Sequence, residues 1–200
     1  PEERAEQKKY TRLADAFTPL AKGMNSEYAN QNAYDAIQIH GGSGFIMEYK
    51  SQRLYRDARI FSIYEGTTQL QVVAAIRYIT NGTYLTMMKE MLETEVAEEL
   101  HPLKVRVEEM VKRYEQSINY VKESGSQEVN DLLARRLYDM TAEIIMSLLI
   151  LDDATRAPEL FTKSAHVYIR MAEEDVLGKS AFVTRFIAED LKYYRQMPIE

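Results

Sequence analysis

The sequence contains no cysteine, and it has only three histidines among its 200 residues. Without cysteine the chain cannot form a disulfide scaffold, carry out thiol catalysis or bind a metal through thiolates. The histidines, His40, His101 and His166, are far apart and show no ligand spacing, so we expect no metal site. Glycine and proline are also scarce, at eight and five residues, and they fall mostly between long stretches with helical periodicity.

Basic clusters and long apolar runs are missing as well. The net charge is −6 and the pI is near 5.3, which argues against nucleic acids or anionic membranes as partners. No apolar run approaches the ~20 residues of a membrane span, and the first residues do not resemble a signal peptide. These absences predict a cytoplasmic protein without a membrane span. Because the chain does not open with methionine, we expect it to be a piece of a longer protein.

Apolar residues recur at helical spacing through the first half of the chain. We expect helices there over residues 3–17, 19–40, 51–58 and 66–79. Thr18 and Pro19 are typical of an N-cap followed by the first helical residue, so they predict a new helix start. Asn81 and Gly82 are typical of a helix end.

The second half shows cleaner apolar stripes. Residues 103–121, 129–151 and 158–176 keep apolar side chains at helical spacing, and we expect a last helix over residues 181–194. No stretch alternates long enough to predict a strand. The predicted fold class is therefore all-α, with a helical bundle in residues 1–82 followed by a second helical bundle in residues 83–200.

One candidate for chemistry is Glu65, which follows an apolar segment beginning at Phe61 and precedes Gly66. Apolar neighbours can desolvate a carboxylate and make it a stronger base, as the removal of a weakly acidic proton requires. The glycine allows the backbone to approach a ligand closely, and the first amides of the following helix are unpaired donors. The alternative is a surface glutamate before an ordinary glycine turn.

A second candidate is the turn Gly41-Gly42-Ser43-Gly44. It follows a helix rather than a strand, which excludes the Rossmann and P-loop geometries. Its three glycines are either a helix C-cap with extra loop glycines or a turn that approaches a ligand. Farther along the chain, Arg56 and Asp57 are interpreted as a buried ion pair that holds the loop.

Three segments taken together resemble a known family. They are similar, in order and spacing, to the C-terminal helical domain of acyl-CoA dehydrogenases: Ala36-Ile-Gln-Ile-His-Gly-Gly-Ser-Gly-Phe45, Tyr55-Arg-Asp-Ala-Arg-Ile60 and Ile63-Tyr-Glu-Gly-Thr-Thr-Gln-Leu70. The resemblance covers about residues 10–82. The segment Thr18-Pro-Leu-Ala-Lys22 resembles the longer members, so residues 83–200 are expected to be their additional C-terminal helical region.

The resemblance implies roles for eight residues. Glu65 matches the base that removes the α-proton of an acyl-CoA thioester, while Tyr64 and Gly66 match positions at the thioester end of the pocket. The residues that match FAD contacts are Thr67 and Gln69, together with Gln38, Gly41 and Gly42, which match the turn that approaches the FAD of a neighbouring subunit. FAD contacts from two subunits imply a homo-oligomer, either a dimer or a tetramer.

The implied reaction is α,β-dehydrogenation of an acyl-CoA to a trans-2-enoyl-CoA, with hydride transfer to FAD and electron-transfer flavoprotein as the acceptor. In the family, the backbone amide of the base and a ribityl hydroxyl of FAD hold the thioester oxygen as the enolate develops. The family's N-terminal helical domain and middle β-domain are absent from these residues. We therefore expect the complete protein to be the enzyme and this piece alone to be inactive. Thr68 and Gln69 stand where many long members carry Asn-Gly.

Two alternatives stay open. One is a non-catalytic helical module for dimerisation or partner binding, whose interface would use the 129–151 stripe and the tyrosine-rich helices. The other is an acyl-CoA oxidase, which shares the base but passes electrons to oxygen. The sequence does not specify the length of the acyl chain.

Overall fold

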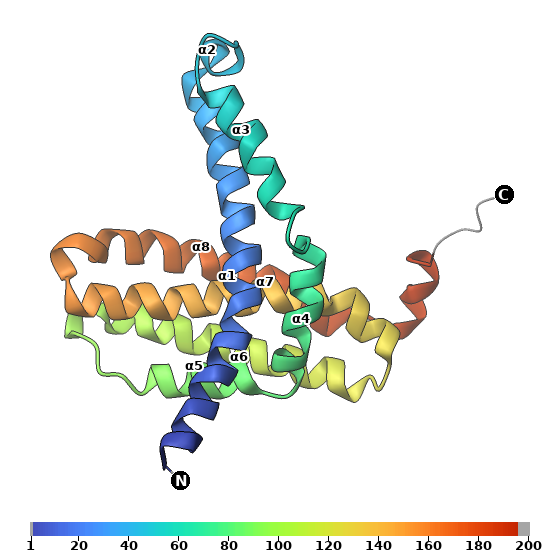
Figure 1. Ribbon diagram of the computed structural model, residues 1–200. Helices are drawn as coiled ribbons and strands as arrows, with labels where there is room; N and C mark the ends of the chain where they lie inside the picture. The colour runs from blue at the N-terminus through green and yellow to red at the C-terminus, as the bar shows by residue number, and fades with distance from the viewer. Residues whose placement is uncertain (1, 196–200) are drawn as a thin grey trace. The chain divides into compact units, whose positions relative to one another are not determined.

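The computed structural model describes residues 2–195, which form helices joined by short connections, without a β-strand (Figure 1). The predicted all-α class is therefore confirmed. The chain divides into two compact units, residues 1–75 and 76–200, and the division falls inside helix α4 (Thr68–Thr80). The domain boundary after residue 82 stays a prediction. Along residues 2–195, no helix combines the length and the apolar character that crossing a membrane requires.

The first unit is built on one long helix, α1 (Glu2–His40). The short helix α2 (Gly42–Phe45) reverses the chain, and α3 (Ser51–Arg59) packs back along α1 (Figure 1). A 3₁₀ turn, η1 (Ile60–Ser62), follows α3 and also contacts α1. The loop that contains Glu65 then leads into α4, so it lies between two segments that are anchored to the same long helix.

The structure corrects the prediction at Thr18 and Pro19. No helix begins there, because Pro19 lies inside α1. Proline lacks the backbone N–H that would bond to the preceding turn, so the helix loses one hydrogen bond at this position. The Thr18 hydroxyl does not cap a helix but donates to the carbonyl oxygen of Ala14 at 2.8 Å. A threonine that bonds back to the preceding turn and one that caps a helix look alike in sequence.

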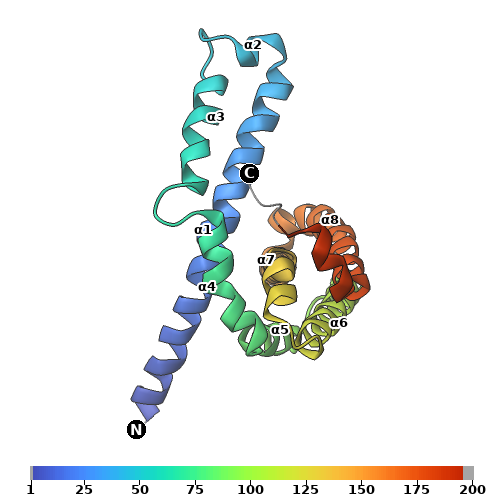
Figure 2. The same cartoon turned by 90° about the vertical axis from the view of Figure 1, so that its right-hand side faces the viewer.

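The second unit contains three long helices that pack on one another, α6 (His101–Glu123), α7 (Gln127–Arg156) and α8 (Pro158–Arg185). Helix α5 (Thr83–Leu92) packs on α6 and α7, and the 3₁₀ turn η2 (Glu98–Leu100) precedes α6 (Figure 2). The predicted stripe of α7 is confirmed as core, with these residues at most 4% exposed: Val129, Leu133, Leu137, Met140, Ile144, Leu148 and Leu151.

The predicted helix over residues 181–194 is wrong. Residues 181–185 belong to α8, and η3 (Ala188–Tyr193) is a separate 3₁₀ helix. Phe186 between them has an extended backbone, is 5% exposed and packs its ring near Phe182 and Tyr194. Its carbonyl oxygen accepts a hydrogen bond from the Tyr120 hydroxyl. These tertiary contacts of Phe186 outweigh the local preference for a continuous helix.

Candidate functional site

Glu65 has an unusual backbone conformation. Its φ is 49°, and among residues 2–195 it is the one non-glycine residue with a positive φ. The following Gly66 also has a positive φ, at 92°. The left-handed conformation costs a residue with a side chain about 1–2 kcal/mol, so neighbouring contacts must hold it. Backbone strain of this kind is concentrated at functional sites.

Three polar side chains of α1 supply such contacts, and we call Lys22, Ser26 and Asn30 the carbonyl clamp. The Lys22 ammonium donates to the carbonyl oxygens of Phe61 at 2.7 Å and Gly66 at 2.6 Å. The Ser26 hydroxyl, which has one proton, lies 2.9 Å from the Phe61 oxygen and 2.6 Å from the Lys22 oxygen. The Asn30 amide donates to Ala58 at 3.2 Å. The clamp therefore ties the end of α3 and the Glu65 loop to α1.

The start of α4 is fixed by two threonines. The Thr67 hydroxyl oxygen accepts a hydrogen bond from the Leu70 amide at 3.3 Å, as an N-cap does. The Thr68 hydroxyl is buried and donates to Glu27 at 2.6 Å. Gln69, between Thr68 and Leu70, is exposed. Of the five residues matched to FAD contacts, the two in this segment thus differ, because Thr67 caps a helix while Gln69 is exposed.

Glu65 lies on an open groove of about 590 Å³ between α1 and its loop. The residues that line this groove are Thr18, Ala21, Lys22, Asn25, Ser26, Ala29, Phe61, Tyr64 and Glu65. Glu65 itself is exposed, and Phe61, Ile63 and Tyr64 are 43–47% exposed. The predicted desolvation of Glu65 is therefore not provided by these residues alone. The groove therefore presents the exposed rings of Phe61 and Tyr64 beside small and polar side chains of α1.

The three glycines of the turn differ in backbone conformation and in the space around them. Gly41 has a φ of 59° and ends α1, donating from its amide to Gln38 at 3.2 Å. A Cβ at Gly44 would lie 2.6 Å from the Ile37 carbonyl oxygen, so glycine is needed there for α2 to pack on α1. A Cβ at Gly42 would meet nothing within 4 Å. The backbone at Gly41 and Gly42 is therefore open to a ligand.

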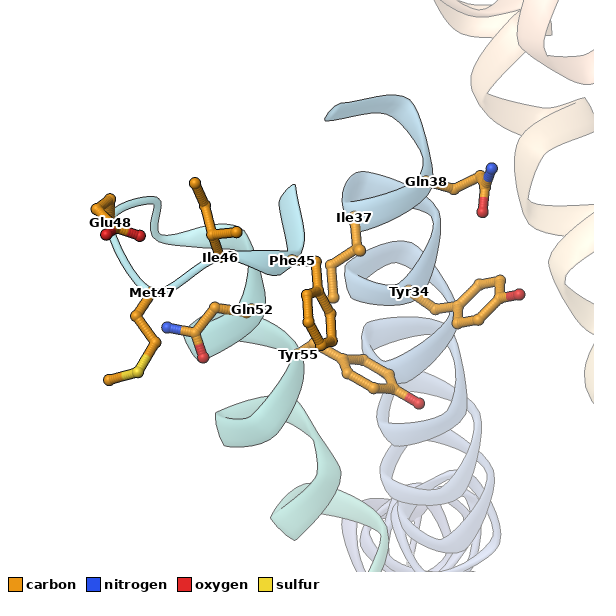
Figure 3. A pocket seen from close by; sticks show the side chains of 9 residues that line it. All are labelled: Tyr34, Ile37, Gln38, Phe45, Ile46, Met47, Glu48, Gln52 and Tyr55. Carbon is orange, nitrogen blue, oxygen red and sulfur yellow. The ribbon is translucent and has the colours of Figure 1, made fainter. Parts of the chain in front are cut away.

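A wider apolar hollow of about 860 Å³ lies beside this turn (Figure 3). Phe45 points in from α2 towards Ile37 of α1 and Tyr55 of α3, while the Gln38 side chain points away from these rings. The rings of Tyr34 and Tyr55 are 6.2 Å apart in an edge-to-face arrangement. Phe45 and Met47 are 76% and 86% exposed, so this end of the unit presents apolar surface for burial by a ligand or a neighbouring domain.

The predicted site residues form two groups at the two ends of α3. Tyr64, Glu65, Gly66, Thr67 and Gln69 follow its C-terminal end, whereas Gln38, Gly41 and Gly42 lie at the turn before its N-terminal end. At 1.5 Å per residue, α3 separates the groups by roughly 13 Å. The structure brings the members of each group together but does not join the two groups into one cluster.

The predicted Arg56–Asp57 ion pair is wrong. Asp57 pairs instead with Arg53 one turn earlier, at 3.5 Å, and both side chains are more than 60% exposed. Neighbouring residues on a helix point in directions about 100° apart, so Arg56 and Asp57 do not face each other. The loop is held by Asn30, Ser26 and Lys22 instead of by Arg56 and Asp57. Among residues 2–195, no three histidine, aspartate or glutamate side chains are grouped as a metal site requires.

The carbonyl clamp is not evident from composition or from the motifs. Its signal is the spacing of Lys22, Ser26 and Asn30, which places a polar side chain on the same face of α1 at every turn. The carbonyl oxygens of α3 and of the loop that they contact lie 28–44 positions farther along the chain. Such long-range partners cannot be identified from the sequence, because they meet only when α3 packs on α1.

Two family models together match nearly the whole chain. The model described as "Acyl-CoA dehydrogenase, C-terminal domain" matches residues 2–79. The model described as "Acyl-CoA dehydrogenase C terminal" matches residues 80–191, more than half of the chain.

Known proteins are similar to parts of the chain. The caffeyl-CoA reductase–Etf complex subunit CarC of Acetobacterium woodii is 56% identical over 52 residues, which are 26% of this chain and 14% of that protein. A crystal structure of an acyl-CoA dehydrogenase family protein from Porphyromonas gingivalis is 37% identical, with a TM-score of 0.54, and the match covers 57% of this chain and 98% of that one. An acyl-CoA dehydrogenase from Bacillus anthracis, solved with FAD, has a TM-score of 0.67 at 20% identity, over 91% of this chain and 36% of that chain. The chain therefore spans about a tenth to a sixth of the length of the curated relatives it matches.

Proposed function

Because this chain belongs to the acyl-CoA dehydrogenase family, a family of oxidoreductases, we propose that it carries the catalytic base of such an enzyme at Glu65. The complete protein would oxidise an acyl-CoA thioester to a trans-2-enoyl-CoA. The observation that carries this proposal is the left-handed backbone of Glu65, held beside an open groove by the carbonyl clamp. A surface glutamate before an ordinary turn needs neither the strain nor the anchoring.

The chemistry requires a carboxylate that is protected from water when the substrate is bound. An acyl-CoA seated in the groove would cover the exposed rings of Phe61 and Tyr64, and the carboxylate of Glu65 would lose water with them. The carboxylate then takes the α-proton. The Glu65 backbone amide is proposed as one donor to the thioester oxygen, because stabilising that oxygen makes the α-proton acidic enough to be removed.

The residues proposed to hold FAD fit such a group. The backbone at Gly41 and Gly42 is unobstructed, and Gln38 and Gln69 are exposed. The Thr67 oxygen accepts a hydrogen bond in its capping role, so its proton remains available to a ligand. When bound, FAD supplies the acceptor for the β-hydride. The solved FAD complex of a protein with this fold supports the assignment.

We infer that the electrons pass to an electron-transfer flavoprotein, and this partner is supported by the Acetobacterium woodii relative, which is a subunit of a caffeyl-CoA reductase–Etf complex. That relative is named a reductase. In the reductive direction the protonated carboxyl of Glu65 would return the proton to the α-carbon. Because the glycine turn and the Glu65 loop lie at opposite ends of α3, we further propose a homo-oligomer in which they contact FAD bound to different subunits.

Purification of the complete protein tests this function. We expect it to be yellow and to bleach anaerobically when an acyl-CoA is added, and acyl-CoAs of graded length would then define the substrate. The Glu65→Gln variant should keep the colour and fail to bleach, whereas residues 1–200 alone should turn over nothing. A colourless complete protein would instead support the non-catalytic helical module. Rapid reoxidation of the reduced protein by oxygen would support the oxidase.

A further inference from the structure

We propose that Lys22 is the positioning residue for Glu65. Its ammonium binds the carbonyl oxygens on both sides of Glu65, at Phe61 and Gly66, and thereby fixes the left-handed backbone on which the carboxyl and the amide of Glu65 depend. The inference rests on the proposed role of Glu65 as the base.

The two bonds of Lys22 close the loop. Phe61 and Gly66 are the ends of the segment that contains Glu65, and a single ammonium lies within 2.7 Å of both of their oxygens. Charge-assisted hydrogen bonds of this length are stronger than hydrogen bonds between neutral groups. With φ positive at both Glu65 and Gly66, the Gly66 carbonyl oxygen accepts the bond from Lys22, so this bond and the left-handed conformation occur together.

Lys22 also lies on the groove in which the acyl-CoA is proposed to bind. It lines the same groove as Tyr64 and Glu65, and its ammonium lies 5.8 Å from the centre of the Tyr64 ring. This distance is within the range of a cation–π contact. One side chain therefore contacts both the loop that carries Glu65 and the aromatic residue next to it.

The other loop contacts explain why loss of Lys22 should displace the loop without unfolding it. The Ser26 hydroxyl can still donate to Phe61, and the Gln71 side chain donates to Gly66 at 3.3 Å. Both are neutral donors, and the second bond is long. Without the ammonium we expect the loop to stay near α1 but to sample several backbone conformations at Glu65.

The test uses the complete, FAD-loaded protein with Lys22→Met, which keeps most of the side-chain length but removes all three donors. Lys22→Arg is the conservative rescue, and Lys9→Met is the matched control because Lys9 is an exposed lysine of the same helix. Glu65→Gln is measured alongside them. The readouts are the rate of flavin reduction, the substrate affinity, the flavin content, and hydrogen exchange of amides in residues 60–70.

For Lys22→Met we expect flavin reduction to slow at least tenfold, with substrate affinity within threefold and flavin content unchanged. Amide exchange in residues 60–70 should be at least tenfold faster. Lys22→Arg should recover most of both effects, and Lys9→Met should match the unaltered protein. If Lys22→Met does not fold, Lys22→Gln is measured in its place.

Two results would overturn the role of Lys22. One is unchanged exchange in residues 60–70, and the other is a normal rate of flavin reduction in Lys22→Met while Glu65→Gln is inactive. A Glu65→Gln variant that reduces flavin normally would instead overturn the proposed function. Hydrogen exchange would in that case still decide whether Lys22 fixes the loop.

Discussion

The Thr68 hydroxyl donates a hydrogen bond to Oε1 of Glu27 at 2.6 Å, and this bond joins the first turn of α4 to α1. Thr68 is buried and Glu27 is exposed. The start of α4 is therefore anchored to the same helix that holds the Glu65 loop. Both ends of that loop are therefore held by polar contacts with α1.

We predict that Thr68→Val lowers the free energy of unfolding of the first unit by about 1–2 kcal/mol, because Val keeps the shape of the side chain but loses a bond to a charged acceptor. Urea denaturation followed by circular dichroism measures the change. Glu27→Gln keeps an acceptor oxygen and should cost less than Thr68→Val. Equal stability of Thr68→Val and the unaltered chain would show that the bond contributes nothing.

The glycine turn gives a matched pair of substitutions that differ only in available space. Gly44→Ala would place a Cβ 2.6 Å from the Ile37 carbonyl oxygen, whereas Gly42→Ala meets nothing within 4 Å. Neither glycine has a positive φ. We expect Gly44→Ala to lower the free energy of unfolding by about 1–3 kcal/mol, as overpacking does, and Gly42→Ala to change it little. Thermal unfolding of the two variants would contradict this account if their midpoints fell together.

Helical periodicity was sufficient to predict the fold class and the long helices of the second unit. Apart from the partly exposed Leu132, the α7 stripe is buried. The predicted helix break before it is confirmed, since Gly125 has a φ of 60° and Ser126 caps α7. The errors at Pro19 and Phe186 share one cause. At Pro19, local residue preferences predict a helix start where the helix in fact continues. At Phe186, they predict a continuous helix where tertiary contacts end it.

The sequence predicted only part of the candidate site. Motif spacing indicated Glu65 and the glycine turn, but the positive φ of Glu65 and its anchoring by Lys22 depend on packing between α1 and the loop. Desolvation of Glu65 could not be derived from apolar neighbours in sequence, because adjacent side chains at a loop point outward unless another surface covers them. In this chain they are exposed.

A buried carboxyl in the second unit predicts a pH-dependent stability. Glu143 accepts a hydrogen bond from Lys179 at 2.9 Å on one oxygen, while its other oxygen is buried and has no hydrogen-bond partner. Burial raises the pKa of Glu143 from 4.5 to about 7, although Lys179 opposes the shift. Burial also lowers the pKa of Lys179, but its bond to Glu143 and the nearby carboxylates raise it overall, so it stays charged.

The folded protein therefore retains a proton that the unfolded chain releases between pH 4.5 and about 7, so stability falls as the pH rises through this window. The full difference corresponds to about 3 kcal/mol. Glu143→Gln does not titrate, so its free energy of unfolding should fall less than that of the unaltered chain between pH 5 and pH 8. Urea denaturation at both values measures the two slopes, and parallel pH dependences would contradict the prediction.

A fully buried tyrosine in the same unit offers a test of its polar core. Tyr114 is 0% exposed, and its hydroxyl lies 2.7 Å from the Thr141 hydroxyl, which donates to the Leu137 carbonyl. Tyr114→Phe removes the phenolic partner in a dry environment and should cost about 1–1.5 kcal/mol of unfolding free energy. Tyr193→Phe is the control, since Tyr193 is 75% exposed, and it should change stability by less than about 0.5 kcal/mol. Similar losses in both variants would be inconsistent with a specific role for the buried bond.

The central claim is that the carboxylate of Glu65 removes the α-proton. The most direct measurement is exchange of the α-hydrogens of a bound acyl-CoA with deuterium from the solvent, followed by mass spectrometry in the complete FAD-loaded protein. We predict that Glu65→Gln binds the acyl-CoA normally but exchanges its α-hydrogens at least 100-fold more slowly, the range expected for loss of a general base. Exchange by Glu65→Gln at the rate of the unaltered protein would contradict the account, because another group would then have to remove the proton.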